Sequence, residues 1–327
     1  MDENSTFETS KELKQIQDSV QQIKDEIGKI IVGQEQMIEN MIIALLCEGH
    51  VLVEGMPGIA KTLTANLLAN TVKADFKRIQ FTPDLMPSDI LGTNIFNSKT
   101  SEFEFKKGPI FSNLVLIDEI NRAPAKTQAA LFECMEEKQV TIDGISYELK
   151  APFLILATQN PIDLEGTYQL PEAQLDRFMM KITVDYPSRE EEKMIITNHH
   201  NREFEKKHPK ANAVIEPARL MEHQKIIASV TVKDELFNYI AALVDGTRNN
   251  PSLFLGASPR ASIALLECSK ALAAIRGRNF VTPEDIKEIL TPVLNHRVVL
   301  TPEKELEGLT PADVIEQIVQ SIEVPRG

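Results

Sequence analysis

Short apolar runs recur along the first part of the chain and alternate with helical or polar stretches. These runs occupy residues 51–53, 76–81, 114–117, 153–157 and 181–184. Strands buried on both faces appear as continuous apolar runs, and their alternation with helices is typical of a parallel sheet that helices cover on both sides. The pattern therefore predicts an α/β domain built on a parallel five-stranded sheet.

Helical patterns precede and follow these runs. Residues 11–31 place apolar side chains at three-to-four spacing, which predicts a leading helix with one buried face. Beyond residue 187, a hydroxyl repeatedly stands three residues before a carboxylate, which is a signal for the start of a helix. We therefore expect residues 1–187 to form the α/β domain and residues 188–327 to form an all-helical domain. The hydroxyl residues that give this signal are Ser188, Thr231, Thr282 and Thr310.

Two polar intervals interrupt the α/β pattern. Residues 83–109 are rich in Pro, Gly, Asn and Ser and are longer than an ordinary connection, so we expect a functional insertion there. Residues 139–149 contain two short strand-like stretches around Asp143-Gly144, a strong signal for a tight turn. The second interval therefore predicts a β-hairpin.

Composition narrows the class of protein. The chain has 327 residues, of which 43% are hydrophobic and 25% charged, and a formal net charge of -13 that argues against non-specific binding of nucleic acid. No apolar run approaches the roughly 20 residues that span a bilayer, and the first residues are polar and acidic. Cys47, Cys134 and Cys268 fit no disulfide or zinc spacing. We expect a cytoplasmic protein with reduced thiols.

A glycine-bearing loop follows the first apolar run and precedes a helical stretch. In such a loop the backbone N–H groups face a phosphate, Lys61 reaches the β and γ oxygens of a nucleotide, and Thr62 ligates Mg²⁺. The strict pattern has glycine at the position of Ala60, and alanine fits if its dihedral angles are helical. The alternative is a chance turn with a surface lysine. The loop residues predicted to contact nucleotide are Gly55, Pro57, Gly58, Ile59, Ala60, Lys61, Thr62 and Leu63.

Two carboxylates, Asp118 and Glu119, end the run at 114–117. Ligands of open parallel sheets gather at the carboxyl ends of the strands, so both acids are expected to face the bound phosphates. Asp118 would then hold Mg²⁺ together with Thr62, and Glu119 would deprotonate the attacking water. The alternative is a pair of solvated acids at the start of a loop.

These motifs and three further segments resemble the MoxR branch of the AAA+ ATPases. The matching segments are 55–62, 118–124, 128–137, 157–161 and 170–178. The resemblance extends from about residue 30 to about residue 299. It implies a P-loop AAA+ core with a helical lid, ATP and Mg²⁺ as cofactors, and a ring of identical subunits, expected to be a hexamer.

The resemblance also implies roles for single residues. Asn160 corresponds to a polar sensor of the γ-phosphate, Arg177 to an arginine finger that reaches the neighbouring subunit's nucleotide, and Arg260 to a second sensor that contacts nucleotide from the same subunit. The structural alternatives are a turn-forming role for Asn160, a salt bridge to Asp176 for Arg177 and a plain surface position for Arg260. Weaker assignments are adenine packing by Val32, Gly33 and Gln34, a switch at Gln80 that turns Glu119 away from water, and a contact of Arg122 across the subunit boundary.

The function that the resemblance implies is ATP-driven remodelling, maturation or activation of a protein client, in some relatives with a partner that bears a von Willebrand factor A domain. The inserts at 83–109 and 139–149 correspond to elements that line the pore or the top of such rings. Two other functions stay open: a helicase- or chelatase-like motor, which the acidic balance disfavours, and a scaffold that binds ATP without hydrolysing it.

Overall fold

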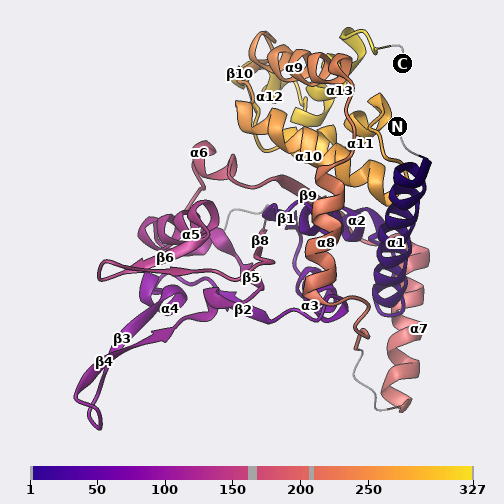
Figure 1. Ribbon diagram of the computed structural model, residues 1–327. Helices are drawn as coiled ribbons and strands as arrows, with labels where there is room; N and C mark the ends of the chain where they lie inside the picture. Colours follow the sequence, from indigo (N-terminus) through magenta and orange to yellow (C-terminus); the bar gives the residue numbers. More distant parts are fainter. Residues whose placement is uncertain (1–2, 161–167, 206–209, 326–327) are drawn as a thin grey trace.

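A five-stranded parallel sheet forms the centre of the computed structural model, which describes residues 3–160, 168–205 and 210–325 (Figure 1). The strand order β2-β5-β8-β1-β9 confirms the predicted parallel sheet, and each expected apolar run forms one strand. Neighbouring strands pair in parallel register throughout, for example Val51↔Met180 and Gly55↔Val184. The strands are β1 (Val51–Gly55), β2 (Phe76–Gln80), β5 (Leu114–Asp118), β8 (Leu154–Gln159) and β9 (Met180–Val184).

Both faces of the sheet are buried. Along β5, Leu114 and Leu116 belong to one apolar cluster, while Val115 and Ile117 belong to another on the opposite face. Successive side chains of a strand point to opposite faces, so an unbroken apolar run is what two covered faces require. Three helices come directly before or after strands of the sheet in the chain. They are α2 (Glu35–Leu46) before β1, α3 (Lys61–Thr71) after β1 and α5 (Ala125–Glu137) after β5.

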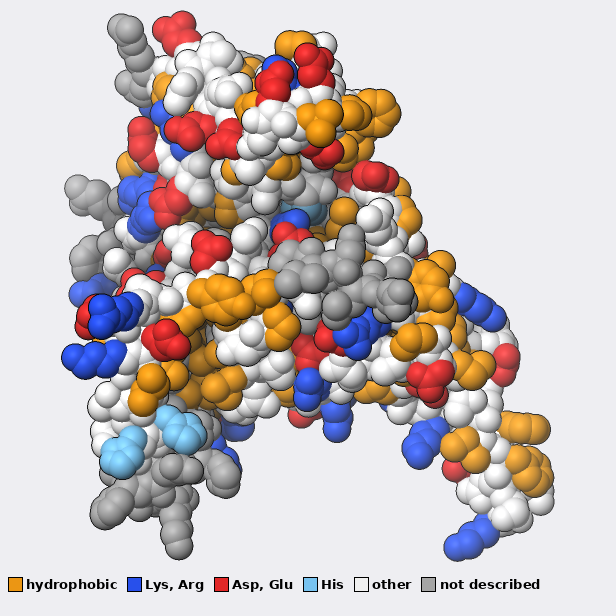
Figure 2. Space-filling model, turned by 180° about the vertical axis from the view of Figure 1, so that it is seen from behind, with side chains coloured by type: hydrophobic (Ala, Val, Ile, Leu, Met, Phe, Trp, Pro, Cys, Tyr) orange, Lys and Arg blue, Asp and Glu red, His pale blue; other side chains and the backbone are white. Residues whose placement is uncertain are grey.

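The insertion at 83–109 contains a short helix and a hairpin that projects away from the sheet (Figure 1). Its elements are α4 (Pro87–Leu91), β3 (Gly92–Asn97), β4 (Glu102–Lys107) and η1 (Pro109–Phe111). Figure 2 shows hydrophobic side chains near the end of this projection, where Ile95, Phe96 and Phe103 are 46%, 54% and 73% exposed. The insertion therefore presents apolar side chains to its surroundings.

The second predicted hairpin also forms. It consists of β6 (Gln139–Ile142) and β7 (Ile145–Glu148), and its turn residues Asp143 and Gly144 both have positive φ, as a two-residue hairpin turn of this type requires. The ring of Phe105 from the first hairpin stacks on Tyr147 at 4.4 Å between centroids. The two hairpins thus support one another.

The described residues of the C-terminal region are helical except for loops and one short strand pair. Its helices are α7 (Arg189–Glu205), α8 (Pro217–Ala228), α9 (Asp234–Arg248), α10 (Pro259–Ile275), α11 (Pro283–Leu294), α12 (Pro302–Leu306) and α13 (Pro311–Ser321). The expectation of helices alone was wrong in one detail, because β10 (Leu253–Leu255) pairs antiparallel with β11 (Val299–Leu300). Strands this short carry too few residues for a periodic pattern.

Three of the four predicted helix starts are confirmed, by capping boxes at Thr282 and Thr310 and by reciprocal contacts between Ser188 and Glu191. The fourth, at Thr231, is wrong, because α9 begins only at Asp234. The backbone of Thr231 instead accepts from the N–H of Val281 and donates to the carbonyl of Asn279. A long-range backbone pairing therefore replaces the expected cap.

The leading helix α1 (Glu3–Gly28) joins the two regions. Its buried stripe includes Leu13, Ile16, Val20, Ile23 and Ile27, and the helix packs against α3 of the core and α10 of the C-terminal region. One apolar cluster consequently continues from the sheet into the C-terminal helices. The boundary between residues 187 and 188 stays a prediction. Among the described residues, no helix combines the length and apolar character needed to cross a membrane.

A buried histidine that directly precedes β1, His50, predicts a pH dependence of stability. The ring of His50 accepts at Nδ1 from the N–H of Ile155 (3.0 Å), so Nε2 carries the proton and donates to the carbonyl of Met135 (3.1 Å). Burial lowers the pKa of His50 to about 4. The unfolded chain, with an ordinary histidine pKa near 6.5, binds the proton first, so stability is lost as the pH falls from about 6.5 towards 4.

We expect His50→Gln to reduce this slope by up to about 1.4 kcal/mol per pH unit. Urea unfolding followed by circular dichroism at a series of pH values between 7 and 5 measures it. The exposed His200 provides the control variant His200→Gln, which should keep the wild-type slope. An unchanged slope in His50→Gln would show that this ring does not contribute.

Candidate functional site

Polar residues from four strands meet at one edge of the sheet. All five strands are parallel, so their carboxyl ends lie together. Gln80 ends β2, Asp118 ends β5, Asn160 follows β8, and the loop 55–62 follows β1. This edge therefore brings together most of the predicted site. Asn160 ends a described stretch, and Pro161, the last residue of its motif, lies outside the described residues.

The glycine-bearing loop is shaped by close backbone approaches. A Cβ on Gly55 would lie 2.5 Å from the side chain of Ile59 and 2.7 Å from the carbonyl of Val184, so only glycine fits. Gly58 has a φ of 87°. The ammonium of Lys61 donates to the carbonyl of Gly55, which folds the side chain back over the loop.

Ala60 differs from the expectation. The sequence argument placed it in a helical conformation, but its φ of 63° and ψ of 15° are left-handed. Helix α3 begins only at the next residue, Lys61. A left-handed non-glycine residue costs roughly 1–2 kcal/mol, which explains why the strict form of the motif has glycine here.

Lys61 lies among acidic groups. Partial burial lowers its pKa, and the negative charges of Asp118, Glu119 and Glu54 oppose that decrease. The lysine therefore remains a cation next to the carboxylates, which is the arrangement that a bound polyphosphate and its metal ion require.

Asp118 and Thr62 can hold a divalent cation. The hydroxyl of Thr62 lies 3.5 Å and 3.4 Å from the two carboxylate oxygens of Asp118, and the hydroxyl of Thr158 donates to Oδ1 at 3.1 Å. Hydroxyl and carboxylate oxygens are hard donors of the kind that Mg²⁺ prefers. Asp118 is only 6% exposed, and Arg78 pairs with it through Nε at 2.5 Å. The donor set fits magnesium.

Glu119 is held in a left-handed conformation with φ 58°. Its N–H donates to the hydroxyl of Thr158 at 3.1 Å, and its Oε2 accepts from the amide of Gln80 at 2.8 Å. The guanidinium of Arg122, on the short helix η2 (Ile120–Arg122), lies 3.0 Å from the same oxygen. Arg122 thus pairs within its own subunit, and its expected contact across the subunit boundary stays a prediction.

The segment Val32, Gly33 and Gln34 lies near the same edge. The amide of Gln34 donates to the carbonyl of Asp185, which directly follows β9, at 3.3 Å. Gly33 has a φ of 68° and packs against Glu191 at the start of α7. The predicted adenine-packing segment is therefore beside the loop that follows β1, because β9 and β1 are neighbours.

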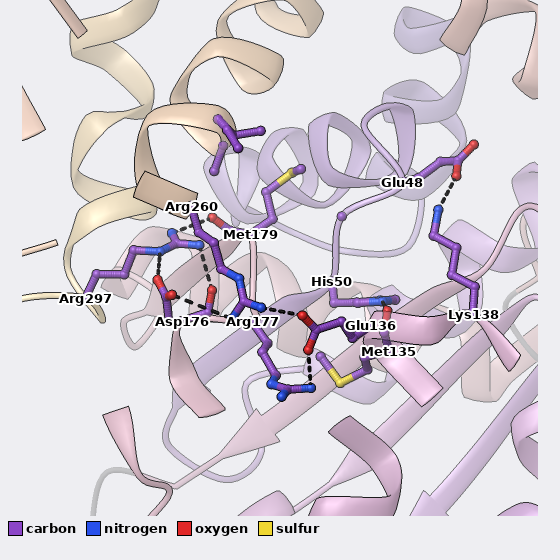
Figure 3. Close-up of a pocket in the computed structure, with 13 residues that line it drawn as sticks. Glu48, His50, Met135, Glu136, Lys138, Asp176, Arg177, Met179, Arg260 and Arg297 are labelled. Carbon is purple, nitrogen blue, oxygen red and sulfur yellow. Dashed lines mark hydrogen bonds and ion pairs between the residues drawn. The ribbon is translucent and has the colours of Figure 1, made fainter. Parts of the chain in front are cut away.

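The predicted arginines lie at the other edge of the sheet (Figure 3). Arg177 and Arg260 both pair with the carboxylate of Glu136, Arg177 through Nη1 at 2.6 Å and Arg260 through Nη2. The backbone N–H of Met179, two residues after Arg177, donates to the carbonyl of His50, which precedes β1. The arginines therefore lie near the amino ends of β1 and β9.

Strand length separates these arginines from the phosphate-binding loop. Four residue steps along β1, from Val51 to Gly55, span about 13 Å. Arg260 was expected to contact nucleotide of its own subunit, but its partners are Glu136 and Asp176 at the amino edge. That expectation is wrong for this arrangement, because helix α10 delivers Arg260 beside Arg177. The alternative of an Arg177–Asp176 pair is also wrong, because Arg177 pairs with Glu136.

Comparison with known proteins now identifies the class. Residues 50–180 match the family model of the ATPase family associated with various cellular activities (AAA), and residues 245–318 match the AAA lid domain. Chaperone MoxR1 of Mycobacterium tuberculosis is 44% identical over 310 residues, which cover 92% of this chain and 81% of the relative.

Two further relatives agree. The protein YeaC of Bacillus subtilis is also 44% identical, over 92% of this chain and 93% of its own length. A crystal structure of a Cytophaga hutchinsonii protein assigned as an ATPase superposes with a TM-score of 0.90 at 44% identity and covers 99% of each chain. The chain belongs to the MoxR family of AAA+ ATPases. The α/β core and helical lid predicted from the sequence are therefore confirmed.

A polar junction that no sequence motif predicted joins the core and lid of this MoxR protein. Arg297, which is 6% exposed, donates from Nε to the carboxylate of Asp176 at 2.9 Å and from Nη2 to the carbonyl of Phe178 at 2.7 Å. Ser258, the N-cap of α10, donates to both oxygens of Asp176. No local motif marks Arg297, since only the packing of the lid on the core buries it.

Arg78 was missed as well, although the sequence contains a signal for it. It stands two residues before Gln80 on β2, so both side chains project from the same face of the strand. In the structure both reach the acidic pair, Arg78 to Asp118 and Gln80 to Glu119.

The junction predicts that Asp176→Ala destabilises the fold by about 3–5 kcal/mol, because it leaves the buried guanidinium of Arg297 without its carboxylate. The midpoint of urea unfolding, followed by circular dichroism, should fall accordingly. Glu172→Ala, at an exposed site on the neighbouring helix α6 (Glu172–Leu175), is the matched control and should leave the midpoint in place. Equal midpoints for both variants would show that the junction contributes no stability.

Proposed function

We propose that this MoxR-type protein binds MgATP at the carboxyl edge of the sheet and hydrolyses it when a second copy supplies Arg177. One observation carries the proposal: Lys61, Thr62, Asp118 and Glu119 gather at one edge of the sheet, while Arg177 lies at the opposite edge of the same subunit. Within a single copy, Arg177 is therefore too far from the nucleotide site to act on the nucleotide bound there.

Each residue at the carboxyl edge has a proposed role. The backbone of the loop 55–62 and Lys61 bind the phosphates, with Leu63 at the start of α3 and Val32, Gly33 and Gln34 beside the base. Thr62 and Asp118 would hold Mg²⁺, which would neutralise charge on the phosphates. Glu119 accepts the proton of the attacking water, and Asn160 contacts the γ-phosphate or that water. The convergence of these groups from separate strands supports the assignment.

Gln80 provides a resting position for the proposed base. Its amide donates to Oε2 of Glu119 at 2.8 Å, and Arg122 neutralises the same oxygen. A carboxylate oxygen has two lone pairs, so these two contacts occupy Oε2 and leave it none for an attacking water. We propose that Glu119 leaves Gln80 when nucleotide and a neighbouring subunit complete the site.

The arginines act between subunits in this proposal. Arg177 reaches the γ-phosphate of the neighbouring copy, and Arg260 joins it from the lid of the same copy, since both pair with Glu136. Head-to-tail contacts of this kind close into rings when the rotation between copies permits, and a hexamer is the expected size. Because Asp176 contacts the lid residues Ser258 and Arg297, motion of the finger segment would be transmitted to the lid.

The proposed output is remodelling, maturation or activation of a protein client in the cytoplasm. A protein that bears a von Willebrand factor A domain is one proposed partner. The relative from Mycobacterium tuberculosis is named a chaperone. The exposed side chains of Ile95, Phe96 and Phe103 on the projecting hairpin give an apolar contact of the kind that a protein client needs. Lys107, at the end of β4 in the same insert, lies over the ring of Phe111, so this lysine is engaged within the chain.

The two other candidate functions differ in what they require. A nucleic-acid motor needs a basic surface, which the net charge of -13 does not favour. A scaffold without turnover needs no catalytic base, yet Glu119 stands beside Asp118 at the site. ATP hydrolysis by assembled protein, measured with and without DNA, distinguishes the three.

The proposed base predicts the behaviour of Glu119→Gln. The amide cannot accept the proton of water, so the turnover rate of ATP should fall by about 10²–10⁴-fold while MgATP binding persists. A coupled phosphate-release assay and equilibrium binding of a fluorescent ATP analogue measure the two quantities. Glu102→Gln, at an exposed position of the hairpin, is the control for the loss of one negative charge. Full turnover by Glu119→Gln would remove Glu119 from this role.

A further inference from the structure

One carboxylate at the amino edge has no role in the function described so far. Oε2 of Glu136 lies 2.6 Å from Nη1 of Arg177, and Oε1 contacts Nη2 of Arg260. Figure 3 shows the carboxylate between the two guanidiniums, one from the core and one from the lid. Each oxygen of Glu136 is therefore committed to a different arginine.

The geometry around Arg177 fixes one end of its guanidinium and leaves the other available. Nη1 donates to the carbonyl of Phe132 at 2.8 Å as well as pairing with Glu136, and these two residues are one turn apart on α5. In the described part of the chain, Arg177 makes its polar contacts through Nη1 alone. Its Nη2 and Nε remain free to bind an anion.

The charges around the cluster are mixed. Three guanidiniums, those of Arg177, Arg260 and Arg297, share the two carboxylates of Glu136 and Asp176. Glu133 and Glu137 line the adjoining depression and form no ion pair within the described residues. The free end of the Arg177 guanidinium, and not a local excess of positive charge, is therefore what an incoming anion would bind.

We propose that Glu136 is a positioning residue that holds Arg177 and Arg260 side by side, aimed at the γ-phosphate bound by the neighbouring copy. The inference rests on the proposed function and extends it to a residue that touches no substrate. Glu136 is 40% exposed, so its ion pairs contribute little to stability. The significance of the contact is geometric, because a guanidinium held at one end by an acceptor loses less freedom when it binds an anion at the other.

The test is Glu136→Gln in the assembled full-length protein. The turnover number for ATP should fall by about 10–100-fold, the loss seen when a supporting group of a site is removed, while the KM for ATP stays within about twofold. Glu136→Asp keeps the charge and should recover part of the loss. Glu133→Gln, one turn earlier on the same helix and exposed, is the matched control and should turn over ATP at the wild-type rate.

A double variant separates positioning from a general structural effect. If Glu136 acts mainly through Arg177, Glu136→Gln should cause little further loss of the residual turnover of Arg177→Ala, measured at high protein concentration. A full additional loss in that background, or turnover in Glu136→Gln that equals or exceeds the wild type, overturns the proposal. The second result would mean that Glu136 restrains Arg177.

The single variant Arg177→Ala distinguishes a failure of the proposed function from a failure of the positioning role of Glu136. If it retains full turnover, the assignment of the finger fails and the role of Glu136 fails with it. If Arg177→Ala is inactive and Glu136→Gln is fully active, the finger stands and only the positioning role is wrong.

Discussion

The direction of the strands is the constraint on which the rest of this structure depends. In a parallel sheet all carboxyl ends share one edge and all amino ends share the other. The loop with Lys61 and the acids Asp118 and Glu119 therefore occupy one edge, and Arg177, which precedes β9, occupies the other. Five-residue strands keep the two edges about 13 Å apart, which is farther than an arginine side chain extends. In the proposed function, the nucleotide site is therefore complete only beside a second copy.

The lid depends on the same geometry. Helix α10 places Arg260 beside Arg177, while Ser258 and Arg297 hold Asp176, the residue immediately before the finger. The elements that would sense the neighbour's nucleotide are thus joined directly to the lid of their own subunit. At the opposite edge, Gln80 and Arg122 hold Glu119 in place. Before the proposed chemistry proceeds, Glu119 must be released from Gln80 at the carboxyl edge. Arg177, at the amino edge, must meet the nucleotide of another copy.

Sequence patterns predicted what depends on neighbours in the chain. The apolar runs gave all five strands, Asp143-Gly144 gave the hairpin, and the ordered motifs gave the family. The errors arose where distant segments meet. Thr231 pairs with a strand-like segment near Phe280, the pair β10–β11 is too short to leave a pattern, and Ala60 takes a left-handed conformation that its neighbours impose. Arg260 was assigned to the wrong edge, because a motif states which residue is present but not where a lid helix carries it.

The most direct test of the central claim is to mix two inactive variants, Lys61→Ala, which lacks the phosphate-binding lysine, and Arg177→Ala, which lacks the finger. If the site is shared, rings assembled from equal amounts of both contain interfaces with an intact loop facing an intact finger. Turnover should then recover to roughly a quarter of the wild-type rate, the fraction expected for random assembly through head-to-tail contacts. A mixture of verified rings that remains as inactive as its two components, or full activity of Arg177→Ala alone, would contradict the account.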